Sequence, residues 1–161
     1  MLKKLPLNDD EATYLLKLIK QIIKNYQIDL SSGNKGEITL KSEVNSVIRA
    51  YALHYYTPPN RSDKMSLHLR DKATNLNLAR INIDPTGFHN NSDGTRISGN
   101  RLLLFSSKEW VEKNDGQTHV KAYTIPNDFS DLKNLEQVFL DFLVYINVKE
   151  EGKIQFSNRL I

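Results

Sequence analysis

Residues 64–84 read Lys64-Met-Ser-Leu-His-Leu-Arg70-Asp-Lys-Ala-Thr-Asn75-Leu-Asn-Leu-Ala-Arg80-Ile-Asn-Ile-Asp84. Apolar and polar side chains alternate on both sides of a polar break at residues 72–75, which predicts an antiparallel hairpin. In the second half, however, the two leucines share one phase of the alternation and the two isoleucines share the other. Both pairs can face one core only if a residue is inserted between them, so the sequence predicts a β-bulge near Ala79.

The bulge sets which residues lie opposite each other in the hairpin. The apolar side chains are expected to bury together as the pairs Met65–Ile83, Leu67–Ile81 and Leu69–Leu78. The other face is expected to hold the polar pairs Ser66–Asn82, His68–Arg80 and Arg70–Asn77. Guanidinium and amide groups are forked donors that match phosphate oxygens and base edges. The alternative is an ordinary exposed sheet face, where the same side chains bond only across the strands.

Helical patterns lie near both ends of the chain. Asn8 followed by Glu11 predicts a capping box, and apolar residues then recur at helical spacing up to Tyr26. Lysines lie on or near the other side of this helix, which fits either a core helix or one that binds a membrane surface or nucleic acid. Near the other end, Ser130 is expected to cap a helix that runs to about Ile146.

Most other segments favour strands. We expect strands at Glu37–Lys41, Tyr51–Tyr56, Leu102–Phe105 and His119–Ile125, an edge strand at Lys153–Phe156, and an irregular stretch from Ser106 to Trp110. The segment from Val44 to Tyr56 as a whole is ambiguous between a strand and a helix, and the aromatic residues of its tail, Tyr51–Tyr56, favour the strand. The sequence therefore predicts a single α+β domain over residues 1–161, with a curved antiparallel sheet of about five to seven strands packed with an N-terminal and a C-terminal helix.

Composition narrows the class of protein. The chain has 161 residues, 25% charged residues and no cysteine, so disulfides and thiolate metal sites are excluded. No apolar run approaches the roughly 20 residues that span a bilayer, and no secretory signal is recognisable, so a cytoplasmic protein is expected. The first 80 residues carry 13 Lys and Arg against 8 Asp and Glu, while the remainder carry 9 against 11. This basic half fits a weak electrostatic footprint for nucleic acid, or scattered surface lysines.

A polar loop after Asp84 contains the other candidate residues. His89 precedes Asn90-Asn-Ser-Asp-Gly94, which is rich in turn formers and is expected to offer backbone donors. A histidine titrates near neutral pH and is therefore a candidate general acid or base, although a plain loop residue is the alternative. The four histidines lack the close spacing of metal ligands, so neither a metal nor another cofactor is predicted.

The sequence also resembles a small bacterial and prophage family over roughly residues 64–148. The shared features are His89-Asn-Asn91-Ser-Asp93-Gly94, then Gly99 and an apolar strand, with Arg80-Ile-Asn82 upstream and Trp110 downstream. Members of that family carry His-x-Asn-Pro-Asp-Gly followed by Gly-x-His-x-His-x-Tyr. The two strand histidines are replaced here by Arg101 and Leu103, and an upstream aspartate by Asn82. The resemblance thus implies a site in this region, and the replacements favour binding over catalysis.

Three functions follow as hypotheses. The first is a phage or mobile-element accessory protein that recognises nucleic acid, or a nucleoprotein complex, through His68, Arg70, Arg80, Asn82, His89, Asn90 and Arg101. The second is a metal-independent ribonuclease that uses His68 or His89 in acid–base chemistry and Arg80 to stabilise the phosphorane. The third is an inhibitor that binds a host or defence protein.

Overall fold

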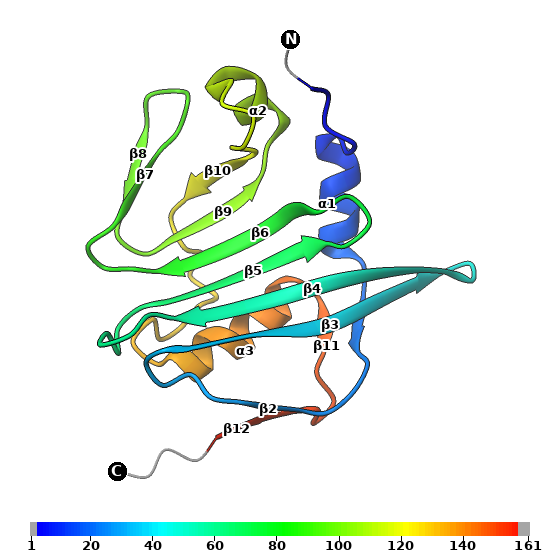
Figure 1. The fold of residues 1–161 in the computed structure, drawn as a ribbon, viewed down its shortest axis with the longest axis vertical. Helices are drawn as coiled ribbons and strands as arrows, with labels where there is room; N and C mark the ends of the chain where they lie inside the picture. Colours follow the sequence, from blue (N-terminus) through cyan, green and yellow to red (C-terminus); the bar gives the residue numbers. More distant parts are fainter. Residues whose placement is uncertain (1–2, 158–161) are drawn as a thin grey trace.

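The computed structural model describes residues 3–157, which form three helices and a large, mostly antiparallel sheet (Figure 1). The predicted α+β class is therefore confirmed. The helices are α1 (Asp9–Lys17), α2 (Ser107–Lys113) and α3 (Leu135–Tyr145). The strands are β1 (Lys20–Ile22), β2 (Tyr26–Ile28), β3 (Asn34–Val44), β4 (Val47–Thr57), β5 (Met65–Asp71), β6 (Leu76–Ile83), β7 (Phe88–Asn90), β8 (Arg96–Ser98), β9 (Arg101–Phe105), β10 (Val120–Tyr123), β11 (Val148–Lys149) and β12 (Ile154–Phe156).

The main sheet contains eight strands in the order β10-β9-β6-β5-β4-β3-β1-β11, which exceeds the expected five to seven. Its additional members are the short strands β1 and β11, which pair in parallel across almost the whole length of the chain. Two small sheets, β12-β2 and β7-β8, lie apart from it. Strands of two or three residues carry too little alternation to be recognised before their partners are known.

The predicted hairpin and its bulge are both present. β5 and β6 pair with the register shift between Leu69 and Arg70, so that Leu78 is the inserted residue. Leu69 consequently lies opposite Ala79 rather than Leu78, but both Leu78 and Ala79 are buried. The two other apolar pairs and all three polar pairs have the predicted register.

The sheet has two unlike faces. The core face carries Leu53, Leu67 and Ile81, which share one hydrophobic cluster with residues of α1 and α3. Both of these helices lie behind the sheet in Figure 1, so neither covers the opposite face. We call that opposite side the open face and define it by the alternate residues His54, Tyr56, Ser66, His68, Arg70, Asn77, Arg80, Asn82, Arg101 and Leu103.

The N-terminal helix is much shorter than expected. The capping box of Asn8 and Glu11 is present, but α1 ends at Lys17 and the chain continues as β1 and β2. The prediction of a helix up to Tyr26 is therefore wrong. The apolar spacing of this segment fits both a helix and short strands, and pairing with β3 and β11 decides in favour of strands.

Lys20 explains why the chain can turn so soon after α1. Its side chain is fully buried, and Nζ donates to the carbonyl oxygens of Leu16, Leu18 and Ile146 at 2.8, 2.9 and 2.9 Å. The ends of helices leave carbonyl groups without partners within the helix. One ammonium group thus serves the last turn of α1 and the C-cap of α3.

Two other predicted boundaries are wrong. Residues 107–113 form α2 instead of an irregular stretch, because the Ser106 side chain accepts from the Glu109 backbone and caps the helix. α3 begins after Asn134 rather than at Ser130, because the Asn134 side chain accepts from the Gln137 backbone. Both caps use residue types that favour such positions, and the sequence contains competing candidates nearby.

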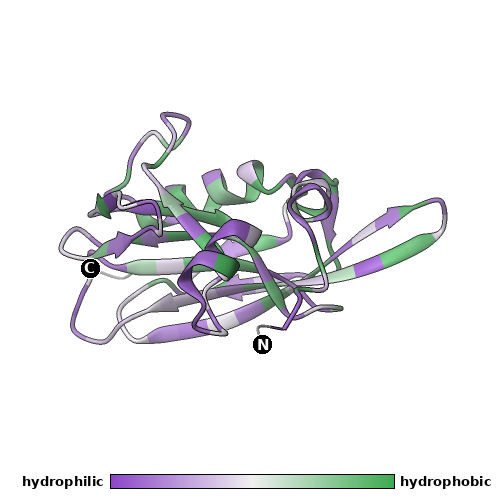
Figure 2. Cartoon of the chain, turned by 90° about the horizontal axis from the view of Figure 1, so that it is seen from above, coloured by the Kyte–Doolittle hydropathy of each residue, from purple (hydrophilic) through white to green (hydrophobic). Residues whose placement is uncertain are grey.

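The β3–β4 hairpin extends beyond the rest of the sheet, and its tip is largely hydrophobic (Figure 2). Val47 and Ile48 are exposed there, and the turn residues Asn45 and Ser46 have positive φ angles. Where the β3–β4 hairpin joins the rest of the sheet, Arg49 forms a bidentate ion pair with the buried Asp71 at 2.8 and 2.6 Å.

None of the helices described has the length and apolar character needed to cross a bilayer.

We expect Lys20→Met to lower the free energy of unfolding by roughly 2–4 kcal/mol. Burial lowers the pKa of Lys20 to about 7, so the charge itself is costly at this position. Its removal nevertheless takes the Lys20 donor from three carbonyl oxygens, of which that of Ile146 is bonded in a buried place and the other two in partly buried ones. Urea unfolding measures the change, with the exposed neighbour Gln21→Met as the control. Equal stability of Lys20→Met and the parent would contradict this role.

Candidate functional site

The polar side chains predicted to cluster lie side by side on the open face. His68 is opposite Arg80, and Asn82 is opposite both Ser66 and Arg101 on its two neighbouring strands. Each pair stands directly across adjacent strands, which are about 4.8 Å apart. The alternation of β5 and β6 therefore brings five of the seven predicted binding residues onto one surface: His68, Arg70, Arg80, Asn82 and Arg101.

Arg80 is the most unusual of these residues. It is half-buried, and its Nε donates to Asn82 Oδ1 at 2.9 Å. It forms no ion pair with any residue between 3 and 157. Burial, with the charge of Arg101, lowers the pKa of Arg80. A guanidinium group that is partly desolvated and lacks a carboxylate partner is a favourable place for an anion.

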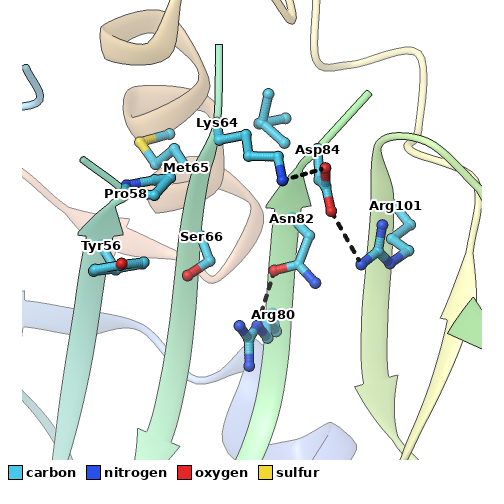
Figure 3. Close-up of a pocket in the computed structure, with 10 residues that line it drawn as sticks. Tyr56, Pro58, Lys64, Met65, Ser66, Arg80, Asn82, Asp84 and Arg101 are labelled. Atoms are coloured by element: carbon cyan, nitrogen blue, oxygen red, sulfur yellow. Dashed lines mark hydrogen bonds and ion pairs between the residues drawn. The ribbon is translucent and has the colours of Figure 1, made fainter. Parts of the chain in front are cut away.

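Arg101 extends this positive region. It is only 8% exposed; Nη1 donates to the Gly99 carbonyl at 2.9 Å, and Nη2 lies 3.7 Å from Asp84. Its Nε is shielded from solvent and has no hydrogen-bond partner among the residues described. Asp84 also binds Lys64 at 3.2 Å and so stands between two cations (Figure 3). One carboxylate is thus shared by Lys64 and Arg101, and an unsatisfied donor is left over.

His68 lies next to His54, with ring centroids 4.6 Å apart. Burial, together with His54, Arg80 and Arg70, lowers the pKa of His68 to about 4. The ring is therefore neutral at pH 7 and can donate one hydrogen bond and accept another. It is poorly suited to act as a general acid at that pH, because almost none of it carries the extra proton.

Arg70 lies in a more balanced environment than Arg80. Glu37 on β3 lies 3.8 Å from Arg70, 3.7 Å from Lys72 and 3.3 Å from His54. This single carboxylate therefore offsets charge at one side of the open face. Asp84 offsets Arg101 in the same way, so Arg80 is the arginine of the open face that has no ion pair with any residue between 3 and 157.

Two cavities flank Arg80 and Asn82 on the open face. The first, of about 260 Å³, is lined by residues that include Tyr56, Lys64 and Arg101. The second, of about 300 Å³, is lined by residues that include His89 and His119. Both volumes lie at or below the lower end for small-molecule pockets, which is roughly 300 Å³. No group of three or more His, Asp or Glu residues within 3–157 is arranged to hold a metal ion.

His89 is brought to the site, but Asn90 is not. His89 lines the second cavity, and its Nε2 is shielded from solvent without a partner among the described residues. Asn90 lines neither cavity; its side chain accepts from Arg96 Nε at 2.9 Å, and its carbonyl accepts from Lys113. Of the seven predicted binding residues, five therefore lie on the open face and His89 lines a cavity beside it, whereas Asn90 does neither.

The expectation that the Asn90–Gly94 loop offers backbone donors is wrong. The Asn91 and Gly94 amides bond within the loop, and the Ser92 amide donates to the buried carboxylate of Glu109 at 3.1 and 3.2 Å. The Asn91 side chain bonds both the N–H and the C=O of Ala122 on β10. The loop is thus fixed to α2 and to the sheet edge, and the amides of Asn91, Ser92 and Gly94 are already engaged.

The sequence did not predict some residues that line the cavities, because they come from segments other than the β5–β6 hairpin and the loop after it. Tyr56 and Lys64 reach the first cavity from β4 and the following loop, and His119 reaches the second from the segment before β10. His119 Nε2 accepts from the Asn77 backbone at 3.0 Å, next to the bulge. The alternation of β4 indicated the face of Tyr56, but its position next to Ser66 depends on the pairing of β4 with β5.

Comparison with known proteins gives one match: a family model described as Family of unknown function (DUF6978) matches residues 7–148. The chain belongs to the DUF6978 family. No curated protein and no solved structure matches it. The matched residues include those that line both cavities and those of the open face of this DUF6978 member. The family description assigns no activity to them.

We expect His68 to contribute to the loss of stability of this DUF6978 protein in acid. Its folded pKa, about 4, lies below the ordinary value of 6.5, so between these values the unfolded chain binds more protons than the folded one. Stability therefore falls as the pH falls through that window. In urea unfolding at pH 7 and pH 5, His68→Gln should show a smaller loss than the parent. An identical loss in both proteins would show that His68 does not titrate in this way.

Proposed function

We propose that the open face of this protein binds the phosphate groups of nucleic acid. The observation that carries the proposal is Arg80: a half-buried guanidinium with no ion pair among residues 3–157, next to the unsatisfied Nε of Arg101. A phosphate group supplies the negative charge that Arg80 lacks and acceptor oxygens for the unused donors of both arginines. Asn82 and the neutral His68 add uncharged hydrogen-bonding groups beside it.

Local charge favours the same ligand. Six cations lie on or beside the open face and accompany two carboxylates, Glu37 and Asp84, which leaves four positive charges in excess; the cations are Lys35, Lys64, Arg70, Lys72, Arg80 and Arg101. The excess is moderate, so binding should be weak at high salt and measurable at low salt. It is also concentrated in the half of the chain that is basic overall.

The biological role that we propose is that of a small accessory protein of a phage or mobile element, acting on nucleic acid or on a nucleoprotein complex. The resemblance of residues 64–148 to a bacterial and prophage family supports this role. Arginine at position 101 and asparagine at position 82, where that family has histidine and aspartate, favour binding over acid–base chemistry.

A ribonuclease is the second candidate, and the position of His89 favours it. His89 lines a cavity together with Arg80 and has an unpaired ring nitrogen, which are two requirements for acid–base attack on a phosphodiester. His68 lines neither cavity, and its pKa of about 4 leaves it without a proton to donate at neutral pH. His119 lines the same cavity, but its ring nitrogens are already hydrogen-bonded to the Asn77 amide and the Gln117 carbonyl, so His89 is the histidine of that cavity with an unpaired nitrogen.

Fluorescence anisotropy with labelled RNA and DNA tests the proposal. We expect Arg80→Met to weaken binding by roughly tenfold or more at low salt, because a charge-assisted contact is lost. It should also reduce the slope of log Kd against log salt concentration by about 0.7 for each lost phosphate contact with a single strand. The control is Lys149→Met, which removes one positive charge from β11, far from β6 in the strand order.

The stability of Arg80→Met separates a binding residue from a structural one. Because the Arg80 charge is desolvated without a carboxylate, its removal should leave the free energy of unfolding unchanged or slightly raised. Absence of affinity for RNA and DNA at low salt would overturn the proposal and leave the protein-inhibitor alternative. Cleavage of RNA that disappears in His89→Ala would replace binding with the ribonuclease function.

A further inference from the structure

The open face contains a straight line of residues that crosses five strands. Lys35 pairs with Tyr56, Tyr56 with Ser66, Ser66 with Asn82, and Asn82 with Arg101. We call these five residues the cross-strand row. With neighbouring strands about 4.8 Å apart, the row extends over roughly 19 Å. It begins and ends with a cation and has an aromatic ring next to one end.

Tyr56 differs from the two other tyrosines of β4. Tyr51 is fully buried and bonds Ser42, and Tyr55 packs edge-on against Phe139 in the core. Tyr56 is 46% exposed, and its ring makes no aromatic or cation contact within residues 3–157. It lines the same cavity as Arg80 and Arg101, where it lies to one side of the cations (Figure 3). A free ring next to phosphate-binding groups can stack on a nucleic-acid base.

The dimensions of the site favour an extended polymer over a small molecule. The two cavities are individually small, and both are bordered by Arg80 and Asn82. A compact ligand of ordinary size would fill more than either one. A nucleic-acid strand can instead place one group in the first cavity and reach the second over Arg80 and Asn82, which border both.

The depth of the cations favours a single strand over a duplex. Arg101 is 8% exposed and Arg80 is half-buried, so both guanidinium groups are recessed among their neighbours. Proteins that read duplex DNA commonly insert a helix or a β-ribbon into a groove, whereas here the ligand must enter the protein surface. A flexible single strand can lower a phosphate into such a recess and turn its base onto an aromatic ring.

We infer that the cross-strand row binds single-stranded nucleic acid, with a base stacked on Tyr56 and neighbouring phosphates held by Arg101 at the end of the row and by Arg80, which lies beside the row two residues before Asn82 on β6. This inference rests on the proposed function and specifies its ligand. Ser66 and Asn82 lie between the ring and the arginines and supply a hydroxyl and an amide to the sugar or base edge. Stacking is tolerant of base identity, so little sequence preference is expected.

Binding of labelled single strands and matched duplexes, as both RNA and DNA, tests the inference. Tyr56→Ala should weaken single-strand binding by roughly 5- to 150-fold, the range for loss of one stacked base, whereas Tyr56→Phe should retain the affinity of the parent. The matched control is Tyr14→Ala, because Tyr14 is 55% exposed on α1, on the other side of the sheet. An oligonucleotide of abasic sites should bind Tyr56→Ala and the parent equally.

The outcomes separate this inference from the function on which it rests. If duplexes bind as tightly as single strands, or if Tyr56→Ala binds normally while Arg80→Met does not, phosphate recognition stands and the single-strand inference is overturned. An equal loss for Tyr56→Ala on intact and abasic strands would also overturn it, because stacking would then not be the cause. If no nucleic acid binds, both ideas are refuted.

Discussion

The residue inserted at Leu78 determines which side chains face water on the central strands. A strand alternates its side chains with a period of two, so without the insertion either the leucines or the isoleucines of β6 would leave the core. The bulge allows both groups to be buried beneath α1 and α3. It also places Arg80 and Asn82 on the face that carries His68 and Ser66. Core packing and the candidate site are therefore consequences of one backbone irregularity.

Much of the fold could be predicted where the signal is local. The capping box at Asn8, the β5–β6 hairpin and the apolar stripe of α3 each depend on residues a few positions apart. The short strands β1 and β11 could not be predicted in this way, because their pairing joins opposite ends of the chain. α2 was missed for a different reason: Ser106 and Glu109 form a recognisable cap, but the helix has only seven residues.

The candidate site could be predicted in part, for the same physical reason. The register of one hairpin follows from the alternation in the sequence, and it predicts the neighbours of His68 and Ser66 on β6. The exposure of Tyr56, the sharing of Asp84 between two cations and the lack of an ion pair at Arg80 within residues 3–157 depend on other strands and loops. The hydrogen bond from the Ser92 amide to Glu109 also could not be predicted from the sequence, because the two residues belong to separate elements.

Lys20 and its three carbonyl acceptors bear on how the chain acquires its structure. Two acceptors lie within four residues of Lys20, but the third, Ile146, is 126 residues away. β1, which contains Lys20, likewise pairs on its second edge with β11, which is far away in the sequence. Proteins emerge from the ribosome N-terminal end first, and contacts between distant residues slow folding. During synthesis the nascent chain therefore carries an incompletely coordinated ammonium and an open strand edge until residues 146–149 have been made, and that interval is when contact with a chaperone would matter most.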